Sequence, residues 1–589
     1  MAGASTLARG VFYPAAGIIL AFVLLAVFFT DATDAVMSTL QGEVIGAFGW
    51  YYVLLVAAFV IFAVWMGLSR FGDIVLGPDD EEPDFKLPVW FSMLFATGMG
   101  IGLVYYGVSE PLSHFVSPKP GVTGDDATLA QAAISQTYVH WGIHAWAIYV
   151  VAGLALAYAI HRKGRPVSIR WALEPVLGDR VKGWLGNVID VVAIIGTVFG
   201  VATSLGLGVL QVAHGLGYLD VVEPSTGLEI GLIAAITAVA AMSVASGLSK
   251  GIKWLSNGNM VLAGIVLAVV LVLGPTLFIL RSWVQSFGYY FANVIQMTFD
   301  TLAFRGDEGL AWESSWTIFY WGWWISWAPF VGVFIARISR GRTVREFVLG
   351  TLAVPMAVAT IWFSVFGGAG LHQEMTEPGS MLDPATGGVN TDTAMFQLFA
   401  TLPGSGTWLA VAGIVLVVVF FVTSSDSGSF VVDMLANGGD PNPPLWSRLF
   451  WAILEGLVAA ALLLAGGLTA LQTAAILIAL PFSLVLIGMA VSIVKELSVE
   501  HRQIVRAERR AARAELTEHV TQKVATTLAG RWENVLPPAP GALRLRVPRR
   551  RDAKGPPRPG PGAGPGAGPG TGPGTGPGTS TDGEPGRGG

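Results

Sequence analysis

The sequence contains no cysteine and few charged residues. Its 589 residues include no Cys, and 13% are Asp, Glu, Lys or Arg, against about a quarter in soluble proteins. Without cysteine, the chain has no disulfides, thiolate zinc sites or cysteine nucleophiles. What remains is apolar: 53% of the residues are hydrophobic and the mean hydropathy is +0.60. Long apolar runs recur through residue 495, which predicts an all-α polytopic membrane protein.

About twelve apolar segments are long enough to cross a membrane. They are residues 11–30, 48–69, 88–108, 138–160, 188–212, 229–248, 257–280, 316–336, 347–369, 408–433, 447–467 and 470–494. Lys and Arg gather in the loops after the fourth, sixth and eighth segments, as in residues 161–165 and 337–342. The positive-inside rule then predicts a multi-pass protein of the cell membrane with both termini in the cytoplasm.

Three stretches outside these segments have distinct compositions. Residues 284–304 mix aromatic with polar side chains, which predicts an amphipathic helix at the outer interface. Residues 497–530 read as a charged helix rich in Arg, which either binds anionic lipid or is only solvated. From residue 537 on, Pro and Gly dominate, so disorder is expected. Nucleic-acid binding is not expected, because no nucleic-acid-binding module is present.

Five of the chain's 20 tryptophans fall within residues 316–327. On a helix, which turns about 100° per residue, one face would carry several rings of this block. They are Trp316, Tyr320, Trp323, Trp324 and Trp327. Such rings pack in a core or form a belt at a bilayer interface, but a stripe three turns long can also wall a pocket for a cation without hydrogen-bond donors. The block alone leaves both interpretations open.

Glycine and hydroxyl residues mark two further segments. Residues 98–102 read Gly-Met-Gly-Ile-Gly, and a glycine spacing of two favours a broken helix over close helix packing. Thr423 and Ser424 open a hydroxyl cluster in the tenth segment. These hydroxyls either bond to their own helix carbonyls or coordinate sodium together with unwound carbonyls. Asp426, in the same cluster, is costly inside a membrane and is therefore a candidate functional residue.

The fourth segment carries aromatic and histidine side chains on opposite faces. Trp141, Trp146 and Tyr149 share one arc, and His140 and His144 fall on the other. Two histidines four residues apart can bind zinc. Because the sequence shows no third ligand and no nearby glutamate base, we expect these histidines to have structural roles.

These motifs, in this order, resemble the betaine/choline/carnitine transporters, most closely the sodium-coupled glycine betaine transporters. The resemblance covers about residues 11–500 and includes Glu110-Pro111 at the end of the glycine segment. It implies two inverted five-helix repeats preceded by two extra helices, and a homotrimer. The predicted organisation is then a cytoplasmic N-terminus (1–10), two peripheral helices (11–86), the first repeat (87–282), an interfacial helix and loop (283–315), the second repeat (316–496), a cytoplasmic Arg-rich helix (497–535) and a disordered tail (536–589).

The resemblance also implies site residues. The substrate site would consist of Trp141, Trp146, Tyr149, Trp323, Trp324, Trp327 and Met99, with Trp321 and Tyr105 on the access path. One sodium site would consist of the carbonyls of Ala96 and Met99 and the hydroxyls of Thr423 and Ser424, near Phe420. A second sodium site of the family pairs two threonines one turn apart. Here Thr197 is followed by Val201, so Thr203 would have to substitute.

The expected function is sodium-coupled import of a betaine-type compatible solute by alternating access, with no organic cofactor and no enzymatic activity. Choline-transporting relatives often carry an acidic residue at the last position of the glycine stretch, where this chain has Gly102. The alternatives are a proton-coupled or exchange transporter of choline, carnitine or ectoine, a membrane enzyme acting on lipid-linked substrates, and an osmosensor that uses its Arg-rich tail.

Overall fold

The computed structural model describes residues 7–98, 100–246, 249–404 and 406–533. In this part of the chain there are eighteen α-helices, three short π- or 3₁₀-helical turns and no strand. The predicted all-α class is therefore confirmed. Met99 and the Pro/Gly-rich tail from residue 534 on lie outside the described residues.

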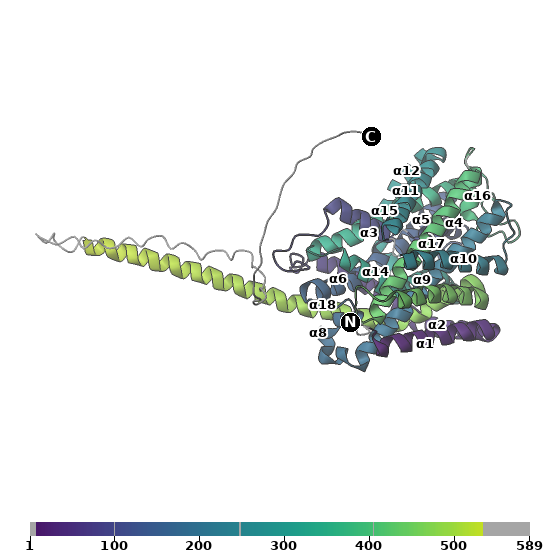
Figure 1. Cartoon of the computed structure of the whole chain (residues 1–589). Coiled ribbons are helices and arrows are strands. Elements are labelled where there is room, and N and C mark those ends of the chain that lie inside the picture. Colours follow the sequence, from purple (N-terminus) through teal and green to yellow (C-terminus); the bar gives the residue numbers. More distant parts are fainter. Residues whose placement is uncertain (1–6, 99, 247–248, 405, 534–589) are drawn as a thin grey trace, which may run out of the picture. The chain divides into compact units, whose positions relative to one another are not determined.

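The helices follow one another along the chain as labelled in Figure 1. Their bounds are α1 Arg9–Phe28, α2 Thr30–Leu68, α3 Leu87–Gly98, α4 Ile101–Val116, α5 Asp126–Trp141, α6 Ile143–Ala157, η1 Tyr158–Arg162, α7 Ile169–Ala172, α8 Glu174–Leu177, η2 Gly178–Lys182, α9 Trp184–Tyr218, α10 Thr226–Ser246, α11 Ser249–Leu273, α12 Thr276–Phe299, α13 Gly306–Glu313, η3 Ser314–Ile318, α14 Phe319–Arg337, α15 Val344–Thr376, α16 Ala394–Thr401, α17 Gly406–Ala436 and α18 Leu445–Glu533.

The chain divides into two units, Met1–Arg509 and Arg510–Gly589. The first contains the helical bundle of Figure 1. In the second, the described residues 510–533 belong to α18, and their side chains are exposed up to residue 531. The charged helix predicted at residues 497–530 is thus present, as the continuation of the last apolar helix.

Ten helices of the described chain are long and apolar enough to cross a membrane, or eleven if the bent pair α3 and α4 counts as one span. Within α18, Gly466 and Gly467 leave helical geometry, and Gly467 has a φ of 60°. Glycine tolerates this left-handed conformation because it has no Cβ. The break falls between the last two predicted segments, which therefore form two arms of α18.

Two helices begin earlier than the segments predicted at those places. The second helix begins at Thr30 rather than at residue 48, because Asp31, Gln41 and Glu43 lower the hydropathy without interrupting the helix. The seventh apolar segment ends at Leu273, and α12 begins at Thr276. Between them lies Pro275, which has no backbone N–H to continue the helix. The amphipathic helix therefore covers residues 276–299 instead of 284–304.

Two of the predicted spans are interrupted, and a third begins in a π-helical turn. The predicted interruption of the glycine stretch is present, because α3 and α4 meet at an angle of 67°. The fourth segment is also interrupted: α5 ends at Trp141, and α6 resumes after Gly142, whose ψ is −136°. The tryptophan block begins in the π-helical turn η3 and continues in α14.

Helix α14 lies directly against its neighbours. A Cβ on Gly332 would approach the Cβ of Ala152 in α6 to 2.7 Å, and a Cβ on Gly322 would approach the Cα of Ile476 in α18 to 2.9 Å. Both distances are shorter than any real side-chain contact. Glycine at these positions therefore allows the backbones to approach, and the aromatic block is held at a fixed distance from α6.

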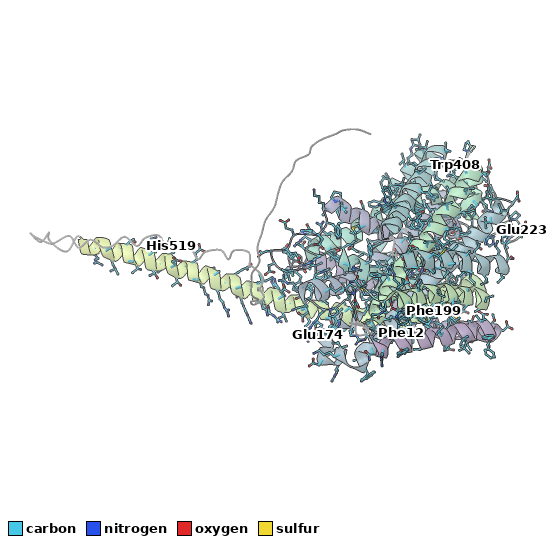
Figure 2. All side chains as sticks on the ribbon, viewed as in Figure 1. Phe12, Glu174, Phe199, Glu223, Trp408 and His519 are labelled. Carbon is cyan, nitrogen blue, oxygen red and sulfur yellow. The ribbon has the colours of Figure 1, made fainter. Side chains whose placement is uncertain are left out.

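Helices α1 and α2 pack on the outside of this core. Phe22 of α1 contacts Phe199 of α9 with ring centroids 4.9 Å apart, and Phe12 contacts Trp451 of α18 at 5.3 Å. Figure 2 labels Phe12 and Phe199 among the side chains of the described chain. The opposite face of α1 exposes large apolar side chains such as Tyr13 and Leu24, as expected for a helix in contact with lipid.

Candidate functional site

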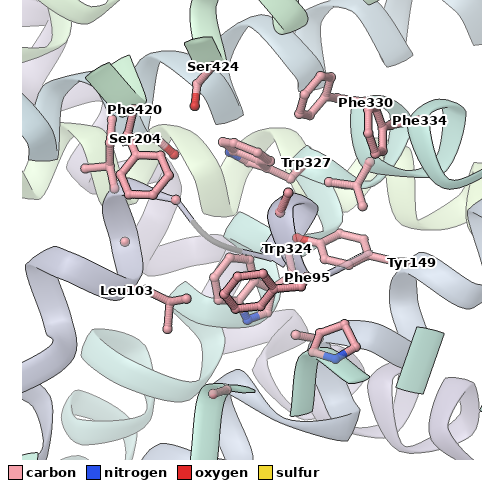
Figure 3. A pocket seen from close by; sticks show the side chains of 18 of the residues that line it. Phe95, Leu103, Tyr149, Ser204, Trp324, Trp327, Phe330, Phe334, Phe420 and Ser424 are labelled. Atoms are coloured by element: carbon pink, nitrogen blue, oxygen red, sulfur yellow. The ribbon is translucent and has the colours of Figure 1, made fainter. Parts of the chain in front are cut away.

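A cavity of about 190 Å³ lies at the centre of the bundle. All six aromatic residues predicted for the substrate site line it: Trp141, Trp146, Tyr149, Trp323, Trp324 and Trp327. Figure 3 shows part of this wall, with Trp324 at its centre and Tyr149 beside it. The rings that the family resemblance implies for the substrate site come from two separate segments and line one cavity. We call these six side chains the aromatic cage.

The rings of the cage pack mostly edge to face. Trp141 meets Trp324 at 4.9 Å between centroids and 71° between planes. Trp146 meets Tyr149 at 5.3 Å and 79°. Trp323 and Trp324 instead stack at 4.8 Å, so at most one face of each is free. Aromatic rings prefer such offset and edge-to-face contacts, which leave negative ring faces available to a cation.

Indole N–H groups fix three rings of the cage. Trp324 donates to the carbonyl of His140 at 2.9 Å, and Trp327 donates to the carbonyl of Gly200 at 2.6 Å. His140 lies at the C-terminal end of α5, where carbonyls lack partners in the following turn. The break at Gly142 therefore provides the acceptor that orients Trp324.

The third indole is held by a buried carboxylate. Trp141 donates its N–H to Oε2 of Glu110 at 2.7 Å, and the hydroxyl of Tyr320 donates to the same oxygen. The other oxygen, Oε1, lies 2.6 Å from Nδ1 of His140. Glu110 is fully buried and thus joins α4, α5 and α14. The Glu110-Pro111 motif does not by itself predict these contacts, although an acidic side chain in an apolar segment is a functional candidate by default.

The other end of the cavity carries hydroxyls. Ala96, Phe420, Thr423 and Ser424, all predicted for the first sodium site, line the same cavity. Figure 3 places Ser424 and Ser204 towards the end that carries Phe420, away from Tyr149. Thr423 donates to the carbonyl of Val419 at 2.9 Å, which leaves its oxygen lone pairs for a further ligand. The predicted ligand Met99 lies outside the described residues.

Four other predicted residues are not among the described residues that line the cavity. Trp321 stacks on His144 with ring centroids 5.4 Å apart. The hydroxyl of Tyr105 donates to Asp392 at 2.5 Å. Thr197 and Thr203 donate to carbonyls of their own helix at 2.9 Å, and Thr203 also donates to Leu471 at 3.1 Å.

The cavity also contains residues that the sequence analysis did not predict. They are Ser256 and Met260 of α11, Phe330 of α14 and Pro355 of α15, among others. No motif marks these positions, because they reach the cavity through the packing of whole helices. Asp426 was a candidate functional residue because a charged side chain is unfavourable inside a membrane. It forms an ion pair with Arg448 at 3.0 Å and is not among the described residues that line the cavity.

A double-mutant cycle tests the carboxylate link. We expect Glu110→Gln and Tyr320→Phe each to lower the free energy of unfolding by about 1–3 kcal/mol, because each leaves a buried polar group without its partner. Their effects should not add, with an interaction energy of about 1 kcal/mol or more. Unfolding in mixed detergent micelles would give the free energy of unfolding of each single and double variant. Tyr51→Phe, which removes a hydroxyl bonded to Ser483, is the matched control and should add to Glu110→Gln. If the effect of Glu110→Gln added to that of Tyr320→Phe as it does to that of Tyr51→Phe, the link between Glu110 and Tyr320 would be contradicted.

Comparison with known proteins identifies the family. The betaine/carnitine/choline family transporter (BCCT) profile matches residues 10–502. An uncharacterised transporter of Mycobacterium tuberculosis is 51% identical over 483 residues, which are 81% of this chain and 80% of the relative. The glycine betaine transporter OpuD of Bacillus subtilis is 44% identical over 499 residues (85% and 96%), and a glycine betaine transporter of Acinetobacter baylyi is 42% identical over 483 residues (82% and 72%). The chain therefore belongs to the betaine/carnitine/choline transporter family and is a multi-pass membrane transporter, not an enzyme.

Proposed function

We propose that this transporter imports a betaine-type compatible solute, with glycine betaine as its main substrate, by sodium symport and alternating access. The observation that carries the proposal is the aromatic cage, in which six rings from α5, α6 and α14 line one cavity. Two relatives that are more than 40% identical are named glycine betaine transporters, which supports the choice of substrate.

The chemistry of the cavity fits a trimethylammonium group. Such a group carries a positive charge but has no N–H donor, so ring faces replace its water at little cost. Each desolvated cation–π contact contributes up to about 2 kcal/mol. No Asp, Glu, Lys or Arg is among the described residues that line the cavity. A substrate with its own carboxylate needs no counter-charge from the wall, whereas a bare cation such as choline would leave its charge unbalanced.

We assign the coupling sodium to the hydroxyl end of the cavity. Thr423 and Ser424 of α17 and the C-terminal end of α3 at Ala96 line the same space. Hydroxyl oxygens and the carbonyls of an interrupted helix are the ligands that transporters offer to sodium. Each positive charge that moves inward gains about 2.3 kcal/mol per 100 mV of membrane potential, which drives accumulation of a neutral zwitterion.

Substitution of Trp324 tests the substrate site. We expect Trp324→Leu to weaken glycine betaine binding by about 2 kcal/mol, or roughly 30-fold, because one ring face is lost. Tryptophan fluorescence titrated with glycine betaine would measure the affinity. Trp408→Leu is the matched control, since Trp408 is 45% exposed on α17 and does not line the cavity. Equal affinity in wild type and Trp324→Leu would reject the proposed site.

Sodium dependence tests the coupling. We expect Thr423→Val to raise the sodium concentration for half-maximal uptake at least about tenfold, because a metal ligand is lost. Glycine betaine affinity at saturating sodium should change far less. In the control Thr39→Val, the removed hydroxyl also bonds to its own helix, at 2.7 Å from the carbonyl of Ala35, but is exposed. Uptake that stays unchanged when potassium replaces sodium would rule out sodium symport, and uptake that follows a pH gradient would indicate protons instead.

Substitution of Gly102 tests whether charge balance makes a zwitterion the preferred substrate. A Cβ at this position would lie 2.6 Å from Cη2 of Trp323 and 2.8 Å from Cη2 of Trp141, so any side chain here enters the cage. We expect Gly102→Asp to weaken glycine betaine transport and to improve choline uptake at least tenfold relative to Gly102→Asn. The added carboxylate supplies the missing counter-charge, worth up to about 4 kcal/mol at short range before desolvation. If the Asp and Asn variants handled choline alike, charge balance would not decide the substrate.

A further inference from the structure

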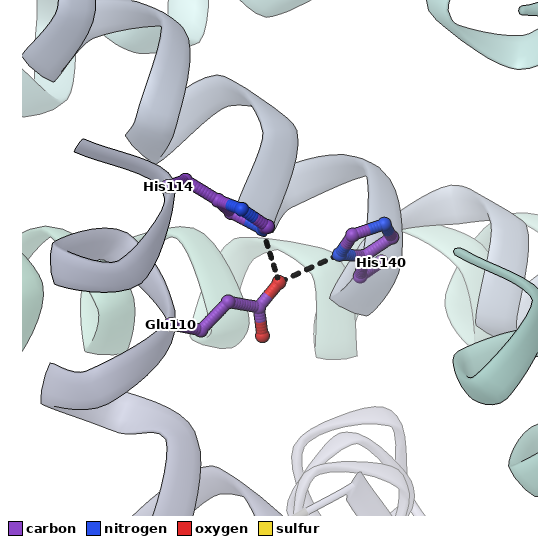
Figure 4. A group of neighbouring side chains, drawn as sticks. All are labelled: Glu110, His114 and His140. Atoms are coloured by element: carbon purple, nitrogen blue, oxygen red, sulfur yellow. Dashed lines mark hydrogen bonds and ion pairs between the residues drawn. The ribbon is translucent and has the colours of Figure 1, made fainter. Parts of the chain in front are cut away.

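A group of titratable side chains lies buried behind the aromatic cage. Glu110 and His114 on α4 and His140 on α5 place their ligand atoms within 4.8 Å of one another (Figure 4). Their exposed fractions are 0%, 3% and 0%. A structural role was expected for His140 because the sequence shows no third metal ligand and no glutamate near it. The fold supplies both, from a helix more than twenty residues earlier in the sequence.

His114 is the member that the structural network does not explain. Neither of its ring nitrogens makes a hydrogen bond with any described residue, although both are buried. Nε2 is directed at Oε1 of Glu110 from 3.4 Å, as Figure 4 shows. A buried imidazole without hydrogen bonds is unfavourable, and each such group in a native protein requires an explanation, which includes an absent ion.

We propose that Glu110, His114 and His140 bind a divalent transition metal ion, with zinc as the best match. Two imidazole nitrogens and one carboxylate oxygen form a known three-residue zinc ligand set, with a fourth position left open. Calcium and magnesium prefer oxygen ligands throughout, and Cu(I) prefers sulfur. The site lies outside the cavity proposed for substrate and sodium.

The three ligand atoms need only a small rearrangement to reach the spacing of a zinc site. Zinc bonds of 2.0–2.1 Å in a tetrahedron place two ligand atoms about 3.3 Å apart. The 3.4 Å between Nε2 of His114 and Oε1 of Glu110 already matches this spacing. The 2.6 Å contact between Nδ1 of His140 and the same oxygen must lengthen, and any proton held in this contact is released to solvent as the metal binds.

Neighbouring groups orient His140 as in known metal sites. Its second nitrogen, Nε2, lies 3.1 Å from the hydroxyl of Thr317, which can accept a hydrogen bond from Nε2 when Nδ1 ligates a metal. A hydrogen bond at the far side of a ligating imidazole fixes the ring and its tautomer. Such a partner is already in place, so the site needs little further organisation.

A second cavity, lined in part by polar side chains, adjoins the site. It has a volume of about 120 Å³, and His114 lines it together with Gln136 of α5 and side chains of α12 such as Asn293. Lys119 and Asp300 also line it and form an ion pair at 2.9 Å, so the lysine charge that faces an incoming cation is balanced. The cavity thus leads to His114, whose two buried ring nitrogens have no hydrogen bond with any described residue.

Metal binding would also affect the cage. Oε1 of Glu110 faces the metal site, and Oε2 holds Trp141 and Tyr320. A metal on Oε1 draws charge away from the hydrogen bonds on Oε2. We therefore expect zinc to change substrate affinity from a position outside the substrate cavity.

The test is zinc binding by the full chain, measured by titration calorimetry without substrate and with an affinity tag free of histidine. We expect one bound zinc per chain in wild type and an affinity at least tenfold weaker in His114→Gln. His144→Gln is the matched control, because His144 is a buried histidine bonded to Thr298 and is not part of this group. Cobalt absorption typical of a tetrahedral site should appear in wild type and be lost in His114→Gln.

His114→Asp keeps an oxygen ligand and should bind zinc more tightly than His114→Gln, which separates loss of a ligand from misfolding. Zinc affinity that is absent in wild type, or equal in wild type and His114→Gln, would overturn the proposal. Since binding is read without substrate, this result does not depend on the proposed function. In a second measurement, zinc should shift the glycine betaine affinity of wild type at least threefold and leave that of His114→Gln unchanged. An identical affinity with and without zinc in wild type would refute the effect on the cage.

Discussion

One buried carboxylate holds together three of the helices that build the central cavity. Glu110 accepts hydrogen bonds from Trp141 of α5 and Tyr320 of α14 and faces His140 with its remaining oxygen. A carboxylate is expensive to bury in a membrane protein unless its oxygens are satisfied. Its bonds therefore fix the relative positions of α4, α5 and α14, and the orientation of Trp141 follows from them. The rest of the cage depends on this alignment, because Trp324 takes its own acceptor from the backbone of the same segment of α5.

The described lining of the cavity lacks a charged side chain. It offers ring faces at one end and hydroxyls at the other. In the proposed function, a zwitterion brings its own two charges into this space, and each charge lies near a group that favours it. The same neutrality explains why a single backbone position matters so much. Gly102 lies against Trp323 and Trp141, so it is the place where one side chain would change the charge of the whole cavity.

The sequence was sufficient for the parts of the fold and the site that follow from local pattern. Apolar length predicted the membrane helices, and glycine spacing predicted the bend between α3 and α4. Family resemblance then predicted that rings from two distant segments would line one cavity. Helix bounds were less accurate, since α2 continues through polar residues that hydropathy excludes. The group around Glu110 was not predicted, because His114 and His140 belong to different helices. Only their packing brings the three ligand atoms together, and no spacing in the chain encodes it.

The contact between Gly332 and Ala152 has a mechanical consequence. With backbones this close, α14 cannot rotate or slide along α6 without a steric clash. If the two helices that carry most of the cage move together, a gate that admits substrate lies in the other walls of the cavity, which α3, α4, α9, α11, α15 and α17 supply. The binding surface would then keep its shape throughout the transport cycle while its surroundings open and close around it.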